Sequence, residues 1–397
     1  MRVLVVGGGV AGTVSALALR RTGAEVTLFE AHPDPGGEVG SFVSLAVNGL
    51  RGLAAVDCLE RVRARGWAIA RQRMWTAKGR PIADVPRGRR AGDPLHSVTL
   101  MRGHLVGELR AAAEEAGVEL RTGERLVAVE PDGRARFAGG RVETGDLVVG
   151  ADGIRSVVRR ALDPAAPTPR YAGVWVISGR SPVVCDASSE GTFNMTVGAH
   201  GAFIHVEPAG GGEVWWQAQV NAAEPPPPSL ADAERLRLLD DLYAAEPVAR
   251  QIIAATTRLH RPSVNHVLDP VRVWHDDRTV LVGDAAHPLG AGQGASMAIE
   301  DGVALGASIG ATTSVHEGLI GYEAARRGRV TRVLRASDDN REVKQAGPLR
   351  RRLAEIGMSV FFNRFYERAT GWLYDYDPTP IRPAAGPERR RAPRWRR

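Results

Sequence analysis

The sequence has few cysteines, and no stretch of it is apolar for long enough to cross a membrane. Cys58 and Cys185 are too few for a disulfide framework or a zinc cage, so a reducing compartment is expected. The apolar stretch from Val3 to Leu19 contains four glycines and has no basic leader, which argues against a signal peptide. We therefore expect a cytoplasmic protein without a membrane span.

Lysine is also scarce, and the positive charge is concentrated at one end of the chain. The 397 residues have a formal net charge of +7. Residues 382–397 contain seven arginines and one glutamate, so the rest of the chain is nearly neutral. This Pro/Ala/Arg tail is predicted to be disordered. Binding of an acidic partner by the tail is an alternative, but the charge pattern of the body predicts no nucleic-acid partner.

Short apolar runs that end at glycines indicate a parallel sheet. Residues 2–6 form the first run, and a helix is predicted over Val14–Arg21 before the stop signal Gly23. Glu25–Glu30 is the second predicted strand, so the chain opens with a βαβ unit. Further buried strands are predicted at residues 118–121, 146–150 and 279–283.

A different pattern interrupts these elements. Residues 171–221 alternate apolar and polar side chains between glycine-rich turns, which predicts an antiparallel sheet. We therefore predict an α/β fold in which a Rossmann-like dinucleotide-binding domain is interleaved with an antiparallel β-sheet domain and followed by C-terminal helices. The predicted bounds are 1–65, 98–165 and 270–335 for the first domain, 66–97 and 166–270 for the second, 336–380 for the helical region and 381–397 for the tail.

The loop after the first strand has the spacing GxGxxG, formed by Gly7, Gly9 and Gly12. The first glycine permits a tight turn, the second lets a pyrophosphate approach the backbone, and the third lets the helix pack on the strand. The motif alone is weak evidence, but Glu30 ends the second predicted strand. A carboxylate there accepts hydrogen bonds from the adenosine ribose and repels a 2′-phosphate. The pattern predicts FAD or NAD as the ligand, not NADP.

Two later segments narrow this prediction. Asp146–Ser156 (DLVVGADGIRS) and Thr279–Pro288 (TVLVGDAAHP) are similar to the DG and GD segments of flavoprotein hydroxylases. Together with the glycine loop and the Arg102-x-x-Leu105 motif, they resemble the single-component FAD-dependent aromatic hydroxylases of the p-hydroxybenzoate hydroxylase fold. That family includes salicylate hydroxylase-like and tetracycline-inactivating monooxygenases. The four motifs span most of the FAD-binding domain, whereas the substrate-binding sheet domain matches only loosely.

The resemblance implies an enzyme and its cofactors. The chain would be an FAD-dependent monooxygenase that hydroxylates an aromatic or polyketide-like small molecule through a C4a-hydroperoxyflavin. O2 is the co-substrate, NADPH or NADH is the transient reductant, and no metal is required. The alternatives are a flavin-dependent epoxidase, a Baeyer–Villiger monooxygenase or a non-oxygenase flavin-binding protein. Only two of the 52 basic residues are lysines, which suggests a GC-rich bacterial source, where secondary metabolism is common.

The resemblance also assigns FAD-binding residues. It implies that Arg102 lies near the diphosphate and ribityl region, that Asp152 contributes to FAD binding and that Asp284 holds the ribityl chain. A helix start near Gly294 would stabilise negative charge on the isoalloxazine N1/O2 edge. The backbone amides expected there belong to Gly292, Gln293, Gly294 and Ala295.

The loop before this helix departs from the family. The stretch from His287 to Gln293 is shorter than in many members, so the proline beside the flavin is missing or moved to Pro288. His287 is expected to fix the turn after its strand by a hydrogen bond, and only secondarily to be a candidate base.

Candidate substrate residues lie on two strands that are predicted to be adjacent, Phe203–Glu207 and Val214–Gln219. A loose similarity with the tetracycline-inactivating enzymes places His205, Trp215 and Gln217 toward the substrate. His205 or Gln217 would hydrogen-bond the substrate, and Trp215 would stack on its ring. No catalytic residue is expected beyond the flavin, with His205 and Gln217 as the candidates. Alternation does not say which face of a strand points inward, so the alternative is that these are surface residues beside the core.

Overall fold

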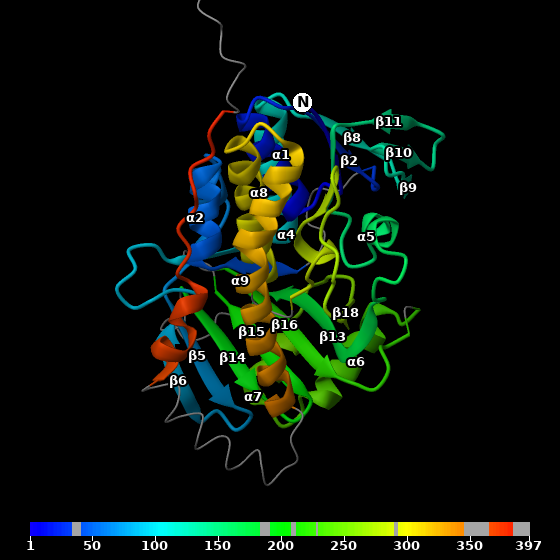
Figure 1. Ribbon diagram of the computed structural model, residues 1–397. Helices are drawn as coiled ribbons and strands as arrows, with labels where there is room; N and C mark the ends of the chain where they lie inside the picture. Colours follow the sequence, from blue (N-terminus) through cyan, green and yellow to red (C-terminus); the bar gives the residue numbers. More distant parts are fainter. Residues whose placement is uncertain are drawn as a thin grey trace, which may run out of the picture.

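The computed structural model describes residues 1–33, 41–182, 191–207, 212–227, 229–289, 293–344 and 365–383. The parallel sheet and its helices form the upper half of Figure 1, which we call the FAD half. A larger sheet forms the lower half, and the long helix α9 (Val315–Lys344) runs along both halves.

A five-stranded parallel sheet forms the centre of the FAD half. Its order is β19-β12-β1-β2-β8, and its middle strand β1 is bounded by parallel neighbours on both sides. The core residues Val3, Leu4 and Val5 are fully buried there, as expected of a strand covered on both faces. The strands are β1 (Arg2–Val6), β2 (Glu25–Glu30), β8 (Glu119–Thr122), β12 (Leu147–Gly150) and β19 (Thr279–Leu281).

Small residues let two helices of this half pack closely. A Cβ added at Gly302 or Gly306 of α8 would lie within 3 Å of atoms of α1. The helices of this half are α1 (Val10–Arg21), α2 (Val47–Ala55), α3 (Leu59–Arg63), α4 (Arg102–Glu115), α5 (Val157–Leu162) and α8 (Gly294–Gly310). Two three-stranded sheets flank them, β3-β7-β4 (Phe42–Leu45, Ser97–Met101, Trp67–Ile69) and β11-β10-β9 (Val142–Thr144, Arg134–Phe137, Leu126–Val129).

The lower half is an eight-stranded sheet that two separate parts of the chain build. Its order is β17-β13-β16-β15-β14-β5-β6, with β18 paired to β13. Strands β14 and β5 pair in parallel, whereas the other strand pairs of this sheet are antiparallel. The predicted sheet is therefore antiparallel except where β14 meets β5. The strands are β5 (Arg71–Thr76), β6 (Pro81–Pro86), β13 (Arg170–Ser181), β14 (Thr192–Val197), β15 (Gly201–Val206), β16 (Val214–Asn221), β17 (Arg258–Leu259) and β18 (Ser263–Val267).

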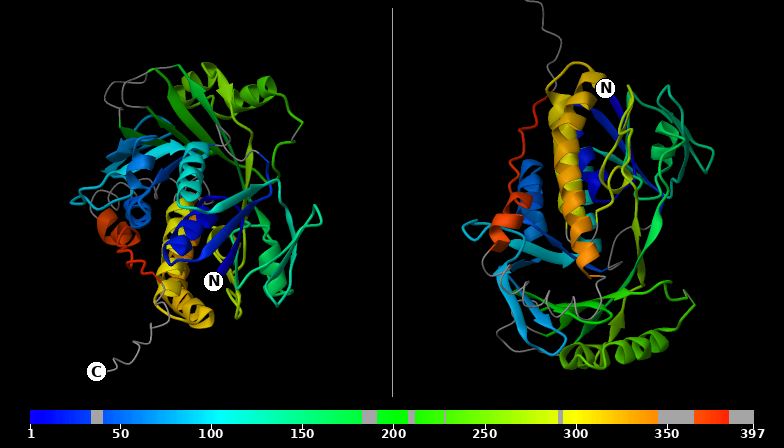
Figure 2. Two further views of the ribbon diagram at one scale, coloured as in Figure 1. Left: turned by 90° about the horizontal axis from the view of Figure 1, so that it is seen from above. Right: turned by 60° about the horizontal axis from the view of Figure 1, so that its bottom comes forward.

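The two faces of this sheet have different coverings. Helices α6 (Asp232–Leu242) and α7 (Pro247–Ala254) cover the face that points away from the FAD half (Figures 1 and 2). Their apolar residues join Phe203 and Trp216 in one buried cluster, and we call this side the closed face. The opposite side looks toward the FAD half, and we call it the wall face.

The C-terminal segment joins the two halves. Residues 365–383, drawn in red in Figure 1, run from the edge of the large sheet upward along α2. Tyr374, which follows the short helix η3 (Gly371–Leu373), packs on Ala46 and Val47. Arg51 of α2 donates to the carbonyl oxygen of Tyr374 at 2.9 Å, so backbone contacts hold this segment to the FAD half.

The predicted fold class is confirmed, with adjustments at element ends. Helix α1 begins at Val10, four residues before its predicted start, so Gly12 lies inside its first turn and not in the loop before it. Helix α9 continues without a break past residue 335, where a domain bound was predicted. The arginine-rich tail falls almost entirely outside the described residues. Within the described ranges, no helix has both the length and the apolar character that a membrane crossing requires.

Candidate active site

The glycine loop lies at the carboxyl end of β1, where parallel sheets bind dinucleotides. Gly7 has φ +105°, and a Cβ there would lie 2.3 Å from the carbonyl oxygen of Ala151. A Cβ at Gly12 would lie 1.9 Å from the carbonyl oxygen of Gly7. Gly9 differs, because no other described residue beyond its chain neighbours has an atom within 4 Å of the Cβ position. Packing therefore requires glycine at positions 7 and 12, whereas Gly9 faces open space.

Helix α1 starts at this open space without a side-chain cap. The first amides of a helix lack partners within the helix, and the helix dipole adds partial positive charge. An uncapped start beside open space suits a diphosphate, so this part of the site fits FAD.

Glu30 holds the same loop through backbone groups. Its Oε2 accepts from the Gly8 N–H and its Oε1 accepts from the His32 N–H, both at 2.9 Å. Arg110 of α4 donates from Nε to the Gly8 carbonyl at 2.7 Å and from Nη2 to Glu30 at 3.1 Å. Sequence reasoning missed Arg110, because nothing local to α4 indicates a partner 102 residues earlier.

Asp152 follows β12 at the same edge of the sheet. Its Oδ2 accepts from the N–H groups of Val157 and Val158 at 2.6 and 3.2 Å, so it caps α5. Desolvation raises the pKa of Asp152. Its Oδ1 has no hydrogen-bond partner among the described residues. A Cβ at Gly7 would lie 3.0 Å from the Asp152 nitrogen, which places Asp152 directly beside the glycine loop.

Asp284 and Arg102 lie close enough to interact electrostatically. The Asp284 side chain is exposed to solvent, yet desolvation by the surrounding protein raises its pKa, opposed by His287 and Arg102. Arg102 starts α4, and its backbone N–H donates to the Ser41 carbonyl at 3.2 Å. The structure therefore brings these two predicted residues together, and we call the region from the glycine loop past Arg102 and Asp284 to the start of α8 the FAD groove.

His287 fixes the turn after β19, as expected. Its Nε2 lies 2.6 Å from Oδ2 of Asp301, which also accepts from the Gly283 N–H at 2.8 Å. Arg326 donates to the other oxygen of Asp301 at 2.8 Å. Burial alone would raise the pKa of Asp301, but His287 and Arg326 hold it at about 2. The permanent charge of Asp301 thus anchors the GD segment to α8.

Helix α8, like α1, starts without a side-chain cap. It begins at Gly294, as predicted, with Gln293 preceding it and no side-chain cap. A Cβ at Gly294 would lie 3.6 Å from the Leu289 carbonyl oxygen, an ordinary contact distance. Asn48 lies beside this start, 3.5 Å from the Gln293 side chain and 2.7 Å from Glu300. Ala295 lies in the first turn of α8, and Gly292 falls outside the described residues.

The register of the large sheet corrects one predicted substrate residue. His205 lies opposite Trp216, and Ile204 lies opposite Gln217. Directly opposed residues share a face and neighbouring residues along a strand alternate, so His205 points away from Trp215 and Gln217. The prediction that all three face one substrate is wrong for His205. It is 5% exposed on the closed face, and desolvation lowers its pKa to about 4.

Trp215 and Gln217 lie on the wall face. The Trp215 ring packs on Trp67 with centroids 3.9 Å apart and lies 6.3 Å from Phe42. Oε1 of Gln217 accepts from the Ser41 hydroxyl at 2.7 Å, and Ser41 also binds the Arg102 backbone. These two residues are therefore linked to the Arg102 end of the FAD groove.

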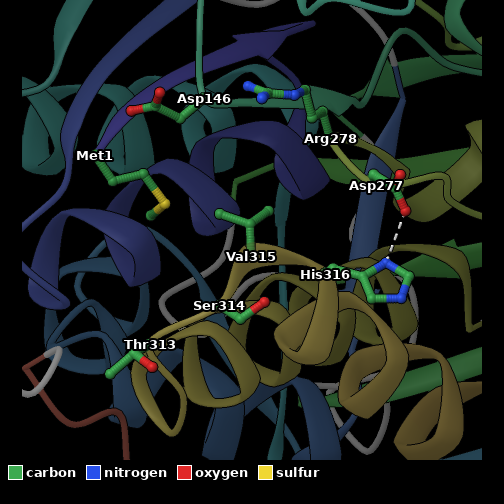
Figure 3. Close-up of a pocket in the computed structure, with 8 residues that line it drawn as sticks. All are labelled: Met1, Asp146, Asp277, Arg278, Thr313, Ser314, Val315 and His316. Carbon is green, nitrogen blue, oxygen red and sulfur yellow. Dashed lines mark ion pairs between the residues drawn. The ribbon is translucent and has the colours of Figure 1, made fainter.

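An open depression lies at the opposite edge of the parallel sheet (Figure 3). Met1, Asp146 and Arg278 line it at the amino ends of three strands. Its ion pair joins His316 and Asp277 at 2.9 Å, and both side chains are more than half exposed. Exposed ion pairs of this kind contribute little free energy. The depression also lies at the edge of the sheet opposite the glycine loop. It therefore supplies no competing active site.

Two other site types find no support within the described residues. No group of three or more His, Cys, Asp or Glu is placed there to hold a metal ion. Burial raises the pKa of the Cys58 thiol to about 11, so this cysteine is a core residue rather than a nucleophile.

The parallel sheet, the glycine loop after β1 and Glu30 at the end of β2 define a dinucleotide-binding protein. Residues 1–337 match the family described as "FAD binding domain". The chain belongs to this family, and it is a flavoprotein monooxygenase with FAD as its cofactor.

The chain is similar to several individual flavoproteins. The chain is 33% identical to a 3-amino-4-hydroxybenzoate 2-monooxygenase of Streptomyces cremeus, over 84% of this chain and 85% of that one. It is 32% identical to an aurachin C monooxygenase/isomerase of Stigmatella aurantiaca, over 82% and 85%. The solved structure of Klebsiella pneumoniae HpxO with FAD and uric acid has the same fold, with a TM-score of 0.80, 22% identity and coverage of 94% and 96%.

Proposed function

We propose that the chain hydroxylates an aromatic small molecule with O2, using NADH or NADPH as the reductant. The observation that carries this proposal is the wall face, whose apolar and aromatic residues Phe193, Ile204 and Trp215 form one buried cluster with Phe42 and Met101 of the FAD half. The two named relatives act on an aminohydroxybenzoate and on aurachin C, which supports an aromatic substrate.

We propose that the FAD groove holds the cofactor along its length. The open space at Gly9 and the amides of α1 receive the diphosphate, and Arg102 offsets part of its charge. Oε1 of Glu30, which accepts from the His32 N–H, has a further lone pair for an adenosine ribose hydroxyl. Asp152 binds FAD beside the loop, and Asp284 holds the ribityl chain.

The isoalloxazine ring would lie at the start of α8. Reduced FAD, when bound, activates O2 for transfer of one oxygen atom. The amides of Gly292, Gln293, Gly294 and Ala295 stabilise negative charge on the ring. Trp215 stacks on the substrate ring, and Gln217 hydrogen-bonds its hydroxyl or carbonyl group. The apolar wall excludes water from the reacting atoms.

A substrate screen tests this function. Purified protein loaded with FAD is mixed with NADH or NADPH and a panel of phenols, aminophenols and quinolones, and reductant oxidation is followed. The proposal predicts that at least one aromatic compound accelerates flavin reduction and yields a hydroxylated product. Flavin reduction that no aromatic compound accelerates, with no product formed, would contradict it.

The diphosphate position has its own test. In a Gly9→Asp variant the new side chain enters open space and caps α1, so the apoprotein is expected to keep or gain stability. Its carboxylate would repel the diphosphate, so FAD binding should weaken at least ~100-fold. Gly9→Ser caps the helix without charge and is the control. Equal FAD affinity in both variants would contradict the placement.

A further inference from the structure

A cluster of four charged side chains lies inside the FAD half, between α8 and α9. Glu300 and Asp301 belong to α8, and Arg326 and Arg329 belong to α9. The two carboxylates and Arg326 are buried, and the Arg329 side chain is 17% exposed. The formal charges of these four groups cancel. Because a buried charge without a partner is costly, each carboxylate depends on its guanidinium partners.

Glu300 connects this cluster to the start of α8. Arg326 donates from Nη1 to Oε2 of Glu300 at 2.5 Å. Arg329 donates to Oε2 from Nε and to Oε1 from Nη2, both at 2.7 Å, which is the two-pronged geometry that binds a carboxylate most strongly. Asn48 donates to Oε1 at 2.7 Å and lies 3.5 Å from the side-chain oxygen of Gln293. A chain of polar contacts therefore runs from Arg329 to the residue that precedes α8.

Asp301 is held by a separate set of contacts. It accepts from Nε of Arg326 at 2.8 Å and lies 2.6 Å from Nε2 of His287. Desolvation alone would lower the pKa of Arg326, but Asp301 and Glu300 raise it above its usual value. Arg326 and Asp301 therefore stay charged and offset each other. Arg329 is then the cation that balances the second carboxylate, Glu300.

The C-terminal segment fixes Arg329 from the other side. Nη1 of Arg329 donates to the Trp372 carbonyl at 3.2 Å, and Nη2 donates to the Leu373 carbonyl at 2.8 Å. Its guanidinium carbon lies 5.8 Å from the centroid of the Tyr376 ring. Each nitrogen of the guanidinium therefore has a hydrogen-bond acceptor, either on Glu300 or on the backbone of this segment. The segment holds Arg329 in the position that pairs it with Glu300.

The cluster lies within electrostatic range of the expected position of the isoalloxazine ring. Glu300 follows Gly294 by six residues, which is about 9 Å along the axis of α8. Side chains of a helix tilt toward its N-terminus, so the carboxylate lies closer to the start of α8 than its backbone does. Reduction adds negative charge to the ring edge that the α8 amides receive. At an effective dielectric constant of about 20, an unpaired unit charge ~10 Å away changes such an equilibrium about tenfold.

We propose that Arg329, held by the C-terminal segment, sets the reduction potential of the bound flavin by neutralising Glu300. Arg329 is a positioning residue, because it acts through Glu300 and not by contact with the cofactor. Without it, a negative charge near the ring disfavours the anionic reduced flavin. This inference rests on the proposed position of the ring at the start of α8, and it is independent of which substrate is oxidised.

Midpoint potentials of the FAD-loaded proteins test this inference through the sign of their shifts. Each protein is reduced without O2 or substrate by xanthine and xanthine oxidase, beside an indicator dye of known potential. In Arg329→Gln, reduced FAD should bind ~10-fold less tightly relative to oxidised FAD, which lowers the potential by about 30 mV for a two-electron couple. Glu300→Gln leaves an excess positive charge, so its potential should rise. The double variant restores the charge balance and should lie within ~3-fold of the wild type.

Two further variants separate charge from structure. Arg332→Gln removes an exposed arginine of α9 whose guanidinium carbon lies 3.9 Å from the centroid of the Trp372 ring, and it should leave the potential unchanged. Arg329→Lys keeps the charge and should keep the potential within ~3-fold of the wild type, although it loses the two-pronged geometry.

Loss of packing predicts a different pattern from loss of charge. Shifts of one sign in both single variants, or a double variant shifted further than either, would overturn the inference. Unshifted potentials in a protein that still oxygenates an aromatic compound would overturn only the role of Arg329. Failure of the wild type to take up FAD would overturn the proposed function itself.

Discussion

The closed face and the wall face of the large sheet carry similar residues in different surroundings. Each has a tryptophan of β16, Trp216 on the closed face and Trp215 on the wall face. On the closed face, α6 and α7 complete a core around His205 and Trp216. On the wall face, Gln217 approaches the FAD half. We therefore expect a polar residue to have a structural role on the closed face and a functional role on the wall face.

The largest expected effect is the loss of folding stability when Trp216, the tryptophan of the closed face, is replaced by alanine. Trp216 is fully buried, so Trp216→Ala should lower the free energy of unfolding by about 3–5 kcal/mol. Trp215 is 5% exposed but belongs to a smaller buried cluster, so Trp215→Ala should cost less, about 2–3 kcal/mol. Denaturant unfolding of both variants measures the difference. Equal losses would show that the two faces are equally closed.

His205 gives the closed face a pH signature. Its pKa is lowered to about 4 in the folded state, so between pH 6.5 and 4 the unfolded chain binds more protons. Folding stability should therefore fall as pH drops through this window, by about 3 kcal/mol from this group. Unfolding of the wild type and of His205→Gln is compared at pH 7, 5.5 and 4.

The difference between these two proteins isolates His205. Burial raises the pKa of Glu246 to about 7, so this group lowers stability as pH rises, the opposite sign. Glu246 is present in both proteins and cancels in the comparison. If His205→Gln changed the substrate affinity and left the pH profile of stability unchanged, His205 would be a substrate residue and its assignment to the closed face would be wrong.

Trp215 should affect binding more than folding. In Trp215→Ala the affinity for the aromatic substrate is expected to fall about 10- to 100-fold, because a stacking surface is lost. Titration of the FAD-loaded protein at 15 °C keeps both tryptophan variants folded. If Trp216→Ala weakened substrate binding as much as Trp215→Ala, the two faces would not differ in function.

The smallest expected effect concerns Gln217. Gln217→Ala should weaken substrate binding about 3- to 10-fold, the contribution of one hydrogen bond. Ser41→Ala removes the partner of Gln217 without removing Gln217 itself. A smaller effect of Ser41→Ala is expected, and equal effects of the two variants would mean that Gln217 acts only by holding Ser41.

The elements that local patterns specify were predictable from the sequence. Strands β1 and β2 begin and end at their predicted residues, because apolar runs between glycines define buried parallel strands. The start of α8 at Gly294 was also predicted. The family resemblance supplied the FAD-binding residues around the start of α8. The structure adds the residues that fix this region, such as Asn48 beside Gln293 and Asp301 beside Gly283.

Contacts between distant segments could not be predicted in this way. The alternation of side chains places His205 and Ile204 on opposite faces of β15. Only the register with β16 shows which of the two shares a face with Gln217. Arg110 reaches the glycine loop from α4, and Arg87 reaches the wall from the end of β6. Each depends on the packing of elements far apart in sequence, on which local periodicity carries no information.

Isotope labelling tests the central claim most directly. The FAD-loaded protein is given a reductant, an aromatic compound that stimulates flavin reduction, and 18O2, and the product is analysed by mass spectrometry. The account predicts that one labelled oxygen atom appears in the product. A product formed without label, or hydrogen peroxide as the sole fate of the oxygen with every aromatic compound, would contradict it.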